Sequence, residues 1–471
     1  MGTIWHPDMA KGDGPKYAAV AENIRAAIAD GRLDVGAKVP PVRELAWTLG
    51  ITPGTVARAY TLLTDEGLLK AEVGRGTFVA APETHAPLYN DLPIEVDSAT
   101  HLQEAQTYQV NLFSPHLPSV GQATLIRTLL AEVAQDPPSG MMHYPTRRGG
   151  ALARQAAAAW LSGAPLGSFD PDDIVLAHGG QNAILLVFQA LLKGRRPAIL
   201  VEELSYPGFR RAAELLRADV IPVAMDAQGL IPDSLDAAAR AHDAQILCTC
   251  PEVHNPTCHF TPIERRQALL NVVRKHDLQI VEDDCYRLGA AQAESYRMLA
   301  PDRTWHISSI SKSITPALRI GIAVSPRGQA PRLRRTAEYS FFGLATPMSD
   351  LCAKLLVHPR LPDLMDQARE GIGDYVRTAV NILGGYDLHW RKDVPFLWLH
   401  LPEGWRASAF VQAADAEGVR LRAAEEYACR DARAPHAVRF AVNAGVSLTV
   451  FENAMQRLRS LLDNPPDRIG V

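Results

Sequence analysis

The stretch "SSISKSITPALRIG", residues 308–321, places Lys312 and Arg319 among several hydroxyl side chains. Strings of this composition are common in solvated loops, so the stretch alone fits a surface loop without a chemical role. Whether its lysine takes part in chemistry depends on what the rest of the chain places around it.

The region around this stretch alternates apolar, strand-like runs with helical stretches. The runs are "DIVLAHGG", "PAILVEE", "DVIPVAM", "AQILCTC", "LQIVEDD", "WHISSIS" and "RIGIAVS". Such alternation predicts an α/β domain built around a mostly parallel sheet. In folds of this kind ligands gather at the carboxyl ends of the strands.

Polar motifs stand at the ends of several of these runs. "HGGQNAI" follows a strand and opens a helix, so the backbone N–H groups of Gly180, Gln181 and Asn182 are expected to point at an anion. Glycine at such a turn is also ordinary turn chemistry. Asp283 ends "IVED", and a carboxylate at a buried strand end requires a cation. Further candidates are Tyr206 in "ELSYPGF", Asn255 before a proline, Tyr286 soon after Asp283, and Arg439 in "AVRFAVNA".

The first eighty residues have an organisation of their own. "YAAVAENIRAAIADGRL" and "PPVRELAWTLG" carry apolar residues at helical spacing, and glycine stops each pattern. "PGTVARAYTLLTDEG" predicts a third helix with Thr52 at its N-cap. "LLKAEVGRGTFVA" predicts two short strands joined at Gly74, Arg75 and Gly76. Two short helices across a tight turn, followed by a hairpin, predict a small α+β winged helix-turn-helix. A helical bundle with a hairpin and no DNA function is the alternative.

Size and charge limit the possible partners. At 471 residues the chain is too long for one hydrophobic core, and we expect a DNA-binding domain at 1–80, a linker at 81–107 and a larger unit at 108–471. The net charge of -4 gives no general attraction to nucleic acid or to an anionic membrane. Any DNA contact must therefore be local.

The compartment is predicted from what the sequence does not contain. No run approaches the roughly 18 apolar residues of a membrane span, and the N-terminus lacks a secretory apolar stretch. The six cysteines form no CxxC pair and no disulfide framework. We therefore expect a cytoplasmic protein with no membrane partner.

The N-terminal motifs occur together in a recognisable order. "PPVRELAWTLGITPGTVARAYTLL" followed by "VGRGTFV" resembles the winged helix-turn-helix of GntR regulators over about residues 14–80. The resemblance implies that this module binds double-stranded operator DNA. It also implies the contact residues: Arg43 at a phosphate, Thr52, Thr55 and Arg58 on the exposed part of the recognition helix, and Arg75 at the tip of the wing.

One cofactor would use all the polar motifs of the larger unit. Pyridoxal phosphate has an aldehyde for a lysine, a phosphate for hydroxyls and arginine, a ring nitrogen for a carboxylate and a phenolic oxygen for donors. "GGQNA", "YPG", "HNPT", "DDCY", "SxSKxxxPxLRxG" and "RF" are similar in order and spacing to fold-type I aminotransferases, over about residues 108–462. Together with the N-terminal module, the chain resembles the MocR/GabR class of bacterial transcription regulators. This implies a mostly parallel sheet with a smaller α/β subdomain.

The same resemblance implies a role for each residue. Lys312 would bind the cofactor covalently, and Arg439 would hold the α-carboxylate of a substrate or effector. The remaining cofactor contacts would be Gly180, Gln181, Asn182, Ser309, Ser311 and Arg319 at the phosphate, Asp283 at the ring nitrogen, Asn255 and Tyr286 at the phenolic oxygen, and Tyr206 stacked on the ring. Tyr144 would reach the partner's phosphate across the interface of a head-to-tail homodimer. No metal site is predicted.

Two departures from the family pattern leave questions open. Gly180 replaces a serine that would contact the phosphate, and "HNPTC" replaces "HNPTG". Cys258 and Cys285 then stand beside cofactor motifs, either as small buried fillers or as thiols sensitive to oxidation. Two functions also remain open. The chain is either a regulator that senses an amino compound or the cofactor itself, or a transaminase with an accessory DNA-binding module.

Overall fold

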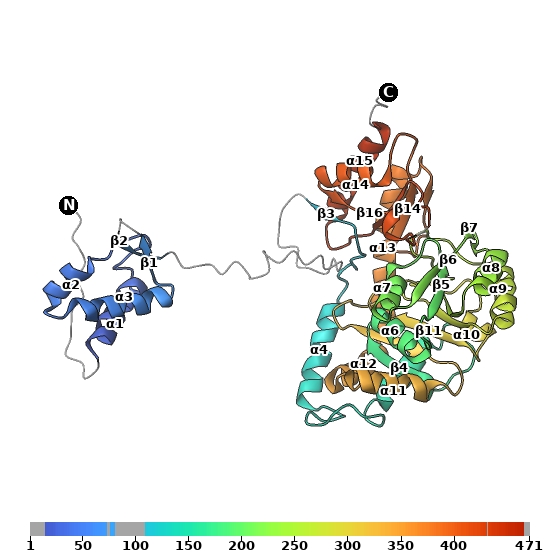
Figure 1. Cartoon of the computed structure of the whole chain (residues 1–471), viewed down its shortest axis with the longest axis horizontal. Coiled ribbons are helices and arrows are strands. Elements are labelled where there is room, and N and C mark those ends of the chain that lie inside the picture. Colours follow the sequence, from blue (N-terminus) through green and yellow to red (C-terminus); the bar gives the residue numbers. More distant parts are fainter. Residues whose placement is uncertain (1–14, 73–75, 81–108, 431, 466–471) are drawn as a thin grey trace. The chain divides into compact units, whose positions relative to one another are not determined.

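The computed structural model describes residues 15–72, 76–80, 109–430 and 432–465. These residues form two compact units, one within residues 1–97 and the other within residues 98–471 (Figure 1). The predicted linker at 81–107 lies outside the described residues, so its boundaries stay a prediction.

The smaller unit contains three helices and a hairpin, as expected for a winged helix-turn-helix. Side chains from all three helices and from both strands are buried in one core, among them Ile24, Leu45, Val56, Leu69 and Val79. In the hairpin Leu69 pairs with Val79 in antiparallel register. The elements are α1 (Lys16–Ala29), α2 (Val42–Leu49), α3 (Pro53–Asp65), β1 (Leu69–Glu72) and β2 (Gly76–Val79).

Gly50 makes the tight turn between the second and third helices possible. It follows the last residue of α2 with a φ of 60°, a left-handed conformation that costs glycine little. Its N–H bonds the carbonyl of Trp47, and α3 begins only three residues later, at Pro53. The short connection fixes α3 as the second helix of the helix-turn-helix.

A sheet of seven strands forms the centre of the larger unit. Its order is β4-β12-β11-β10-β9-β5-β6, and β12 alone runs antiparallel to its neighbours. The seven apolar runs in the sequence supply these seven strands, which confirms the predicted mostly parallel sheet. The strands are β4 (Ile174–His178), β5 (Ala198–Glu202), β6 (Asp219–Val223), β9 (Ala244–Thr249), β10 (Gln279–Asp283), β11 (Thr304–Ser309) and β12 (Ile320–Val324).

Helices cover both faces of this sheet. One face packs against α6 (Gly180–Leu191), α7 (Pro207–Leu215) and α11 (Ala330–Phe341). The other packs against α4 (Gln122–Gln135), α5 (Ala151–Leu161) and α12 (Thr346–Leu356) near β4, and against α8 (Pro232–Ala241), α9 (Ile263–Lys275) and α10 (Tyr296–Leu299) near β5. A membrane-spanning helix, with the length and apolar character that crossing requires, is not found among the described residues.

The single antiparallel strand brings distant motifs to one edge of the sheet. Strands β4, β10 and β11 end at His178, Asp283 and Ser309, and parallel strands present their carboxyl ends at the same edge. Because β12 runs the other way, it begins at this edge, directly after Arg319. The turn from 310 to 319, which contains Lys312, therefore lies at the edge where the other polar motifs end.

Gly321 of β12 lies directly behind the turn that follows β4. A Cβ atom at this position would collide with the backbone carbon and oxygen of Gly179. Gly321 pairs with Ala177 in the adjacent strand, so the close approach belongs to the regular pairing of β12 with β4. Glycine is required here because the two backbones touch.

A smaller subdomain with its own core completes the larger unit. Its four-stranded sheet has the order β13-β14-β17-β16, and helices α13, α14 and α15 supply buried side chains to the adjoining core. Figure 1 shows this part in orange and red. Its elements are α13 (Leu361–Leu383), β13 (Leu388–His389), β14 (Phe396–His400), α14 (Ala407–Ala416), β16 (Arg422–Ala423), β17 (Ala437–Ala441) and α15 (Leu448–Asp463).

Short elements connect these layers. Strand β3 (Val110–Asn111) pairs in parallel with β15 (Val419–Arg420), which ties the start of the larger unit to the smaller subdomain. A two-stranded hairpin of β7 (Met225–Asp226) and β8 (Gly229–Leu230) follows β6. Two 3₁₀ turns occur at η1 (Pro171–Asp173) and η2 (Ala424–Glu426).

Candidate functional site

The turn after β4 has the features of an anion-binding site. Gly179 has a φ of 83° and precedes α6, whose first backbone N–H groups, those of Gly180, Gln181 and Asn182, have no acceptor within the helix. A Cβ atom on Gly179 would lie 2.6 Å from Nη2 of Arg319, so the guanidinium group lies directly against the turn. A helix N-terminus and a guanidinium group that meet in this way favour a phosphate.

Two serine hydroxyls after β11 lie close to this turn. The hydroxyl of Ser309 lies 2.9 Å from that of Ser311 and 3.0 Å from the carbonyl oxygen of Ile320. It also accepts a hydrogen bond from the Ser311 backbone N–H at 3.1 Å. Ser309 therefore shapes the loop that contains Lys312, while the Ser311 hydroxyl retains hydrogen-bonding capacity for an anion.

Lys312 lies beside Tyr286 in this loop. Its Nζ atom is 5.3 Å from the centre of the Tyr286 ring. Burial raises the pKa of the Tyr286 hydroxyl, but the positive charges of Lys312 and Arg439 outweigh burial and lower that pKa below its usual value. Tyr286 thus links the lysine with the arginine of β17 and is poised to donate to an electron-rich oxygen.

Asp283 is a buried carboxyl group in need of a cation. Burial raises its pKa, and its Oδ1 atom accepts a hydrogen bond from the Cys285 backbone N–H at 3.0 Å. Among the described residues it forms no ion pair. A protonated ring nitrogen would supply the missing positive charge and lower the pKa of Asp283.

Two buried amide oxygens also have no hydrogen-bond partner in the described chain. They are Oδ1 of Asn255 and Oε1 of Gln181, and the Asn255 side chain is 2 % exposed. Buried polar atoms are rarely left in this state, which indicates a polar ligand beside them. The Gln181 amide is held in place because its Nε2 donates to the Gly208 carbonyl at 2.8 Å.

Tyr206 lies next to the anion-binding turn. A Cβ atom on Gly208 would collide with both the Gln181 amide oxygen and the Tyr206 ring, so these two side chains lie together over that glycine. Burial raises the pKa of the Tyr206 hydroxyl and keeps it protonated. The position suits an aromatic platform for a planar ligand.

Arg439 lies in an aromatic enclosure on β17 and is 3 % exposed. Its Nη1 donates to the Tyr427 hydroxyl at 2.9 Å and to the Phe113 carbonyl at 3.3 Å, and its Nη2 lies 3.5 Å from the Tyr286 hydroxyl. The Phe396 ring centre is 4.3 Å from the guanidinium carbon. Burial opposes the charge, yet Tyr427 and Tyr286 outweigh it and raise the pKa of Arg439.

This guanidinium group is charged, buried and lacks a carboxylate partner among the described residues. Its Nε atom has no hydrogen-bond acceptor in the described chain. A buried cation with spare donors is costly unless a ligand supplies an anion. The arrangement is therefore suited to binding a carboxylate near Lys312.

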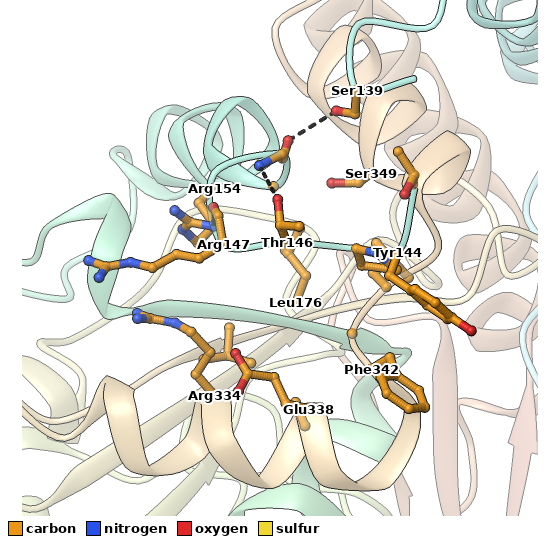
Figure 2. A pocket seen from close by; sticks show the side chains of 18 of the residues that line it. Ser139, Tyr144, Thr146, Arg147, Arg154, Leu176, Arg334, Glu338, Phe342 and Ser349 are labelled. Atoms are coloured by element: carbon orange, nitrogen blue, oxygen red, sulfur yellow. Dashed lines mark hydrogen bonds between the residues drawn. The ribbon is translucent and has the colours of Figure 1, made fainter. Parts of the chain in front are cut away.

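Tyr144 does not join the other predicted site residues within one chain. Its side chain is 77 % exposed, and its ring centre lies 5.5 Å from that of Phe342. It lines a separate cavity of about 250 Å³ with Thr146, Arg147 and Arg334, shown in Figure 2. A role for Tyr144 at the cofactor phosphate would therefore require a second chain.

Of the two cysteines beside the cofactor motifs, Cys258 is buried and Cys285 is half-buried. Burial raises the pKa of the Cys258 thiol to about 12, and its Sγ donates to the Phe396 carbonyl at 3.3 Å. Burial also raises the pKa of the Cys285 thiol well above its usual value. A Cβ atom on Gly180 would lie 2.7 Å from the Cys285 sulfur, so this thiol fills the space that a serine at 180 would need. Both thiols stay protonated, which favours their interpretation as buried fillers.

The predicted DNA contacts lie on exposed parts of the smaller unit. Arg43 is exposed in the first turn of α2, and Arg58 is exposed on α3 with its guanidinium carbon 4.2 Å from the centre of the Tyr17 ring. Thr52 occupies the N-cap of α3, but its hydroxyl lies 2.9 Å from the Thr55 hydroxyl and does not cap the helix backbone. Arg75 lies outside the described residues.

Several residues of the site could not be found from the sequence motifs. Tyr427 and Phe396 surround Arg439 because β14 pairs with β17, where Trp398 stands opposite Arg439. Tyr427 follows the 3₁₀ turn η2 and belongs to no motif. Tyr427 and Phe396 are brought to Arg439 by the pairing register of the smaller sheet. The sequence does not show this register.

Comparisons with known proteins agree with this fold. The family model of class I and II aminotransferases matches residues 109–458, and that of bacterial regulatory proteins of the gntR family matches residues 16–79. The HTH-type transcriptional regulator YdeF of Bacillus subtilis, whose own function is uncharacterised, is 30% identical over 464 residues, covering 98% of this chain and 97% of that protein.

Two further comparisons cover part of the chain. The HTH-type pyridoxine biosynthesis transcriptional regulator PdxR of Corynebacterium glutamicum is 30% identical over 318 residues, covering 66% of each protein. An archaeal alanine:glyoxylate aminotransferase of known structure aligns with a TM-score of 0.68 at 21% identity, covering 76% of this chain and 91% of that one. At that identity the structural match shows the fold alone.

A winged helix-turn-helix joined to an aminotransferase fold defines a class of DNA-binding regulators. The chain belongs to the class I and II aminotransferase family, in the MocR-type group of GntR transcription regulators. Its cofactor is pyridoxal phosphate. The residues of the site fit this group, because the turn at Gly179 and Arg319 suits its phosphate, Asp283 suits its ring nitrogen, and the amine of Lys312 lies close by.

Proposed function

We propose that the larger unit senses a small amino compound, or pyridoxal phosphate itself, and thereby controls DNA binding by the winged helix. The observation that supports this most strongly is the buried guanidinium group of Arg439, which has no carboxylate partner among the described residues and lies next to Tyr286, which in turn contacts Lys312. A carboxylate at Arg439 would place a neighbouring amino group close to the lysine. An α-amino acid carries both groups.

Different side chains of the site bind different parts of the cofactor. Pyridoxal phosphate, when bound, supplies an aldehyde that reacts with amines and a ring that withdraws electrons. Lys312 supplies the protein's own amine, and Asp283 keeps the ring nitrogen protonated. Arg319 and the first turn of α6 hold the phosphate. Tyr286 donates to the phenolic oxygen with Asn255, and Tyr206 limits the freedom of the ring.

Transamination is the second candidate function. Lys312, Asp283 and Arg439 lie in one site, which is what an amino-transfer reaction needs. The 2-aminoadipate transaminase of Thermus thermophilus is 28% identical over 294 residues, covering 59% of this chain and 71% of that protein. The complete winged helix favours regulation. Turnover of an amino acid with 2-oxoglutarate, measured as formation of glutamate, would favour catalysis instead.

The proposed function is tested by two measurements on the same protein. The twenty L-amino acids are titrated into the cofactor-loaded chain while its visible absorbance is recorded, and a gel shift on DNA from its own promoter is run beside each titration. We expect at least one compound to change the spectrum and the DNA affinity over the same concentration range. A spectral change that leaves DNA binding unaltered throughout would contradict sensing.

We also propose a head-to-tail homodimer that acts in the cytoplasm. Apolar side chains are exposed around Tyr144, namely Met141, Met142, Tyr339 and Phe342. A second copy of the chain would cover them. Tyr144 would then contact the partner's cofactor phosphate. Each site would need two chains, and a ligand that alters this interface could reach both winged helices.

The winged helix is expected to lose DNA affinity when exposed arginines are removed. Arg43→Ala and Arg58→Ala should each lower the salt dependence of binding by about one unit of slope, because one phosphate contact is lost. If Arg58 reaches a base edge, its loss should also reduce sequence preference by about 1–3 kcal/mol. Gel shifts at several salt concentrations measure both effects, and Arg75→Ala is tested in the same way.

Arg25 offers a matched control on the same unit. Its guanidinium group already pairs with Glu66 at 2.9 Å, so Arg25→Ala should leave the salt slope unchanged. If Arg43→Ala, Arg58→Ala and Arg75→Ala all behaved like the control, this face of the winged helix would not be the DNA contact.

A further inference from the structure

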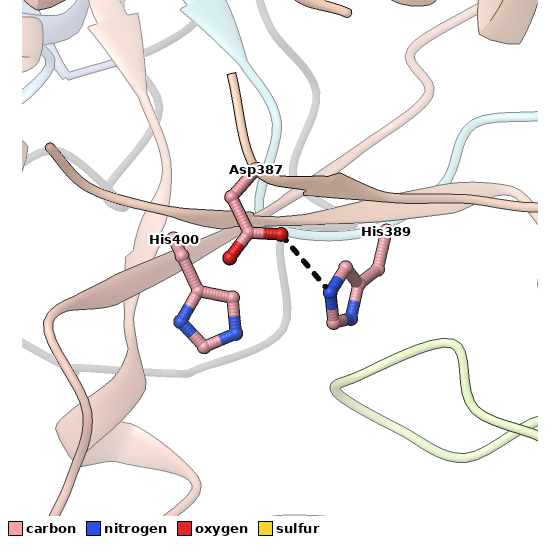
Figure 3. A group of neighbouring side chains, drawn as sticks. All are labelled: Asp387, His389 and His400. Carbon is pink, nitrogen blue, oxygen red and sulfur yellow. Dashed lines mark ion pairs between the residues drawn. The ribbon is translucent and has the colours of Figure 1, made fainter. Parts of the chain in front are cut away.

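Three polar side chains, none of them assigned to the cofactor, cluster on the smaller subdomain. Asp387 immediately precedes β13, His389 ends it, and His400 ends β14. The backbone N–H of His400 bonds the carbonyl of Asp387, and His389 pairs with Trp398. Since alternate residues of a strand share a face, this register places the three side chains on one face of the sheet, as Figure 3 shows. We call Asp387, His389 and His400 the histidine cluster.

The distances in the histidine cluster suit a metal ion. One nitrogen or oxygen atom from each residue lies within 4.8 Å of the others. Nε2 of His389 is 3.2 Å from Oδ1 of Asp387. The Asp387 side chain is 66% exposed and that of His389 is 32% exposed, so an ion can enter from solvent. Small changes of side-chain torsion angles would bring all three atoms to within about 2.0–2.2 Å of one Zn²⁺ ion.

A fourth residue supports the cluster from behind. His259 lies in the loop before α9, and its Nε2 is 3.1 Å from Nδ1 of His389. A histidine that binds metal through one nitrogen usually donates its other N–H to an acceptor, which fixes its orientation. His259 can be that acceptor for His389, so that Nε2 of His389 presents its lone pair to the ion.

Metal binding requires an imidazole nitrogen that carries no proton. The indole N–H of Trp398 donates to Nε2 of His400 at 3.1 Å, which keeps that nitrogen free of a proton. An ion that takes this lone pair would displace the indole hydrogen bond.

We propose that Asp387, His389 and His400 form a binding site for a divalent transition metal ion, of which Zn²⁺ is the best fit, with His259 orienting His389. Two imidazole nitrogens and one carboxylate oxygen are ligands that Zn²⁺ favours, whereas Mg²⁺ and Ca²⁺ favour oxygen alone. Water completes the coordination. The bound ion would join β13 and β14 and, through His259, stabilise the loop that also contains Asn255.

The test is titration of Zn²⁺ into the full chain, purified without a histidine tag and followed by calorimetry. Wild-type protein should bind one ion per chain at this site, and Mg²⁺ should not compete. His389→Ala should abolish this binding, whereas His436→Ala, at an exposed histidine outside the cluster, should not change it. Trp398 supplies a second readout, since Zn²⁺ should alter the indole fluorescence of wild-type protein but not of a Trp398→Phe variant.

The role of His259 is tested separately. His259→Phe should weaken Zn²⁺ binding by about 10–100-fold, the usual effect of losing the acceptor behind a metal ligand. His259→Gln should restore most of the affinity, because its amide oxygen can accept the same hydrogen bond.

Equal binding by wild type and His389→Ala would overturn the proposal. If His389→Ala does not fold, as judged by circular dichroism, Asp387→Asn takes its place, since the side chain is exposed and the substitution nearly isosteric. An Asp387→Asn protein with unchanged Zn²⁺ affinity would equally exclude the site. So would wild-type protein that binds no Zn²⁺ at micromolar concentrations.

Discussion

Lys312→Ala is expected to remove the visible absorbance of the bound cofactor while the fold stays intact. The covalent bond between the aldehyde of pyridoxal phosphate and a lysine produces this absorbance, and alanine has no amine to form it. Lys312 lies in the loop after β11, and no hydrogen bond or ion pair of its side chain is seen among the described residues. The substitution should therefore cost little stability. The absorbance spectrum after dialysis and the circular dichroism of the same sample measure the two effects.

The phosphate contacts proposed at Gly180 and Arg319 should still retain some cofactor without a covalent bond. That fraction should be released by dialysis, because only hydrogen bonds and charge hold it. Lys392→Ala is the control, since this lysine is exposed and belongs to the smaller subdomain. A Lys312→Ala protein whose spectrum survives dialysis unchanged would show that another residue binds the aldehyde.

Arg439→Gln is expected to abolish the response to α-carboxylates without loss of the cofactor. The guanidinium group is 3 % exposed, and removing one partner of a buried charge pair costs about 2–5 kcal/mol, or roughly 30- to 4,000-fold in affinity. Glutamine keeps a polar group beside Tyr427, so the enclosure should remain folded. The apparent affinity for L-alanine, followed by absorbance and by gel shift, measures the change.

Ethylamine serves as the matched ligand because it has the amine of alanine without the carboxylate. Its affinity should be the same for wild type and Arg439→Gln. Arg420→Gln is the matched protein control, since Arg420 packs on the Phe113 ring with a side chain that is 44% exposed. If L-alanine alters the wild-type spectrum and acts on Arg439→Gln with equal strength, Arg439 does not bind the carboxylate. A natural effector that lacks a carboxylate would make Arg439 irrelevant to sensing.

The central sheet could be predicted from the sequence because its strands are buried on both faces. Such strands appear as continuous apolar runs, and "AILVE" and "IGIAV" are buried at every position. The motif at Lys312 could be placed for the same reason, since it directly follows one of these strands. The antiparallel direction of β12 could not be predicted, because its apolar run is like those of the six parallel strands of the sheet.

The surroundings of Arg439 and the histidine cluster depend on shorter elements. Strand β13 contains two residues, too few for any periodic pattern to predict it. His259 and His389 are 130 positions apart in the sequence and meet only through tertiary packing. The proposed role of Tyr144 cannot be deduced from one chain at all, because its contact would belong to a second copy.

The contact between Gly321 and Gly179 has a consequence for how this protein can evolve. The turn after β4 rests against the start of β12, so it cannot move unless β12 shifts against β4. Replacing Gly321 by any larger residue would disturb folding and cofactor binding together, and no substitution elsewhere in the turn restores the lost space. Selection can therefore adjust cofactor affinity at Ser311, whose side chain is expected to meet the phosphate, but not at Gly321. A lineage that loses the cofactor could accept change at Ser311 long before it accepts any at Gly321.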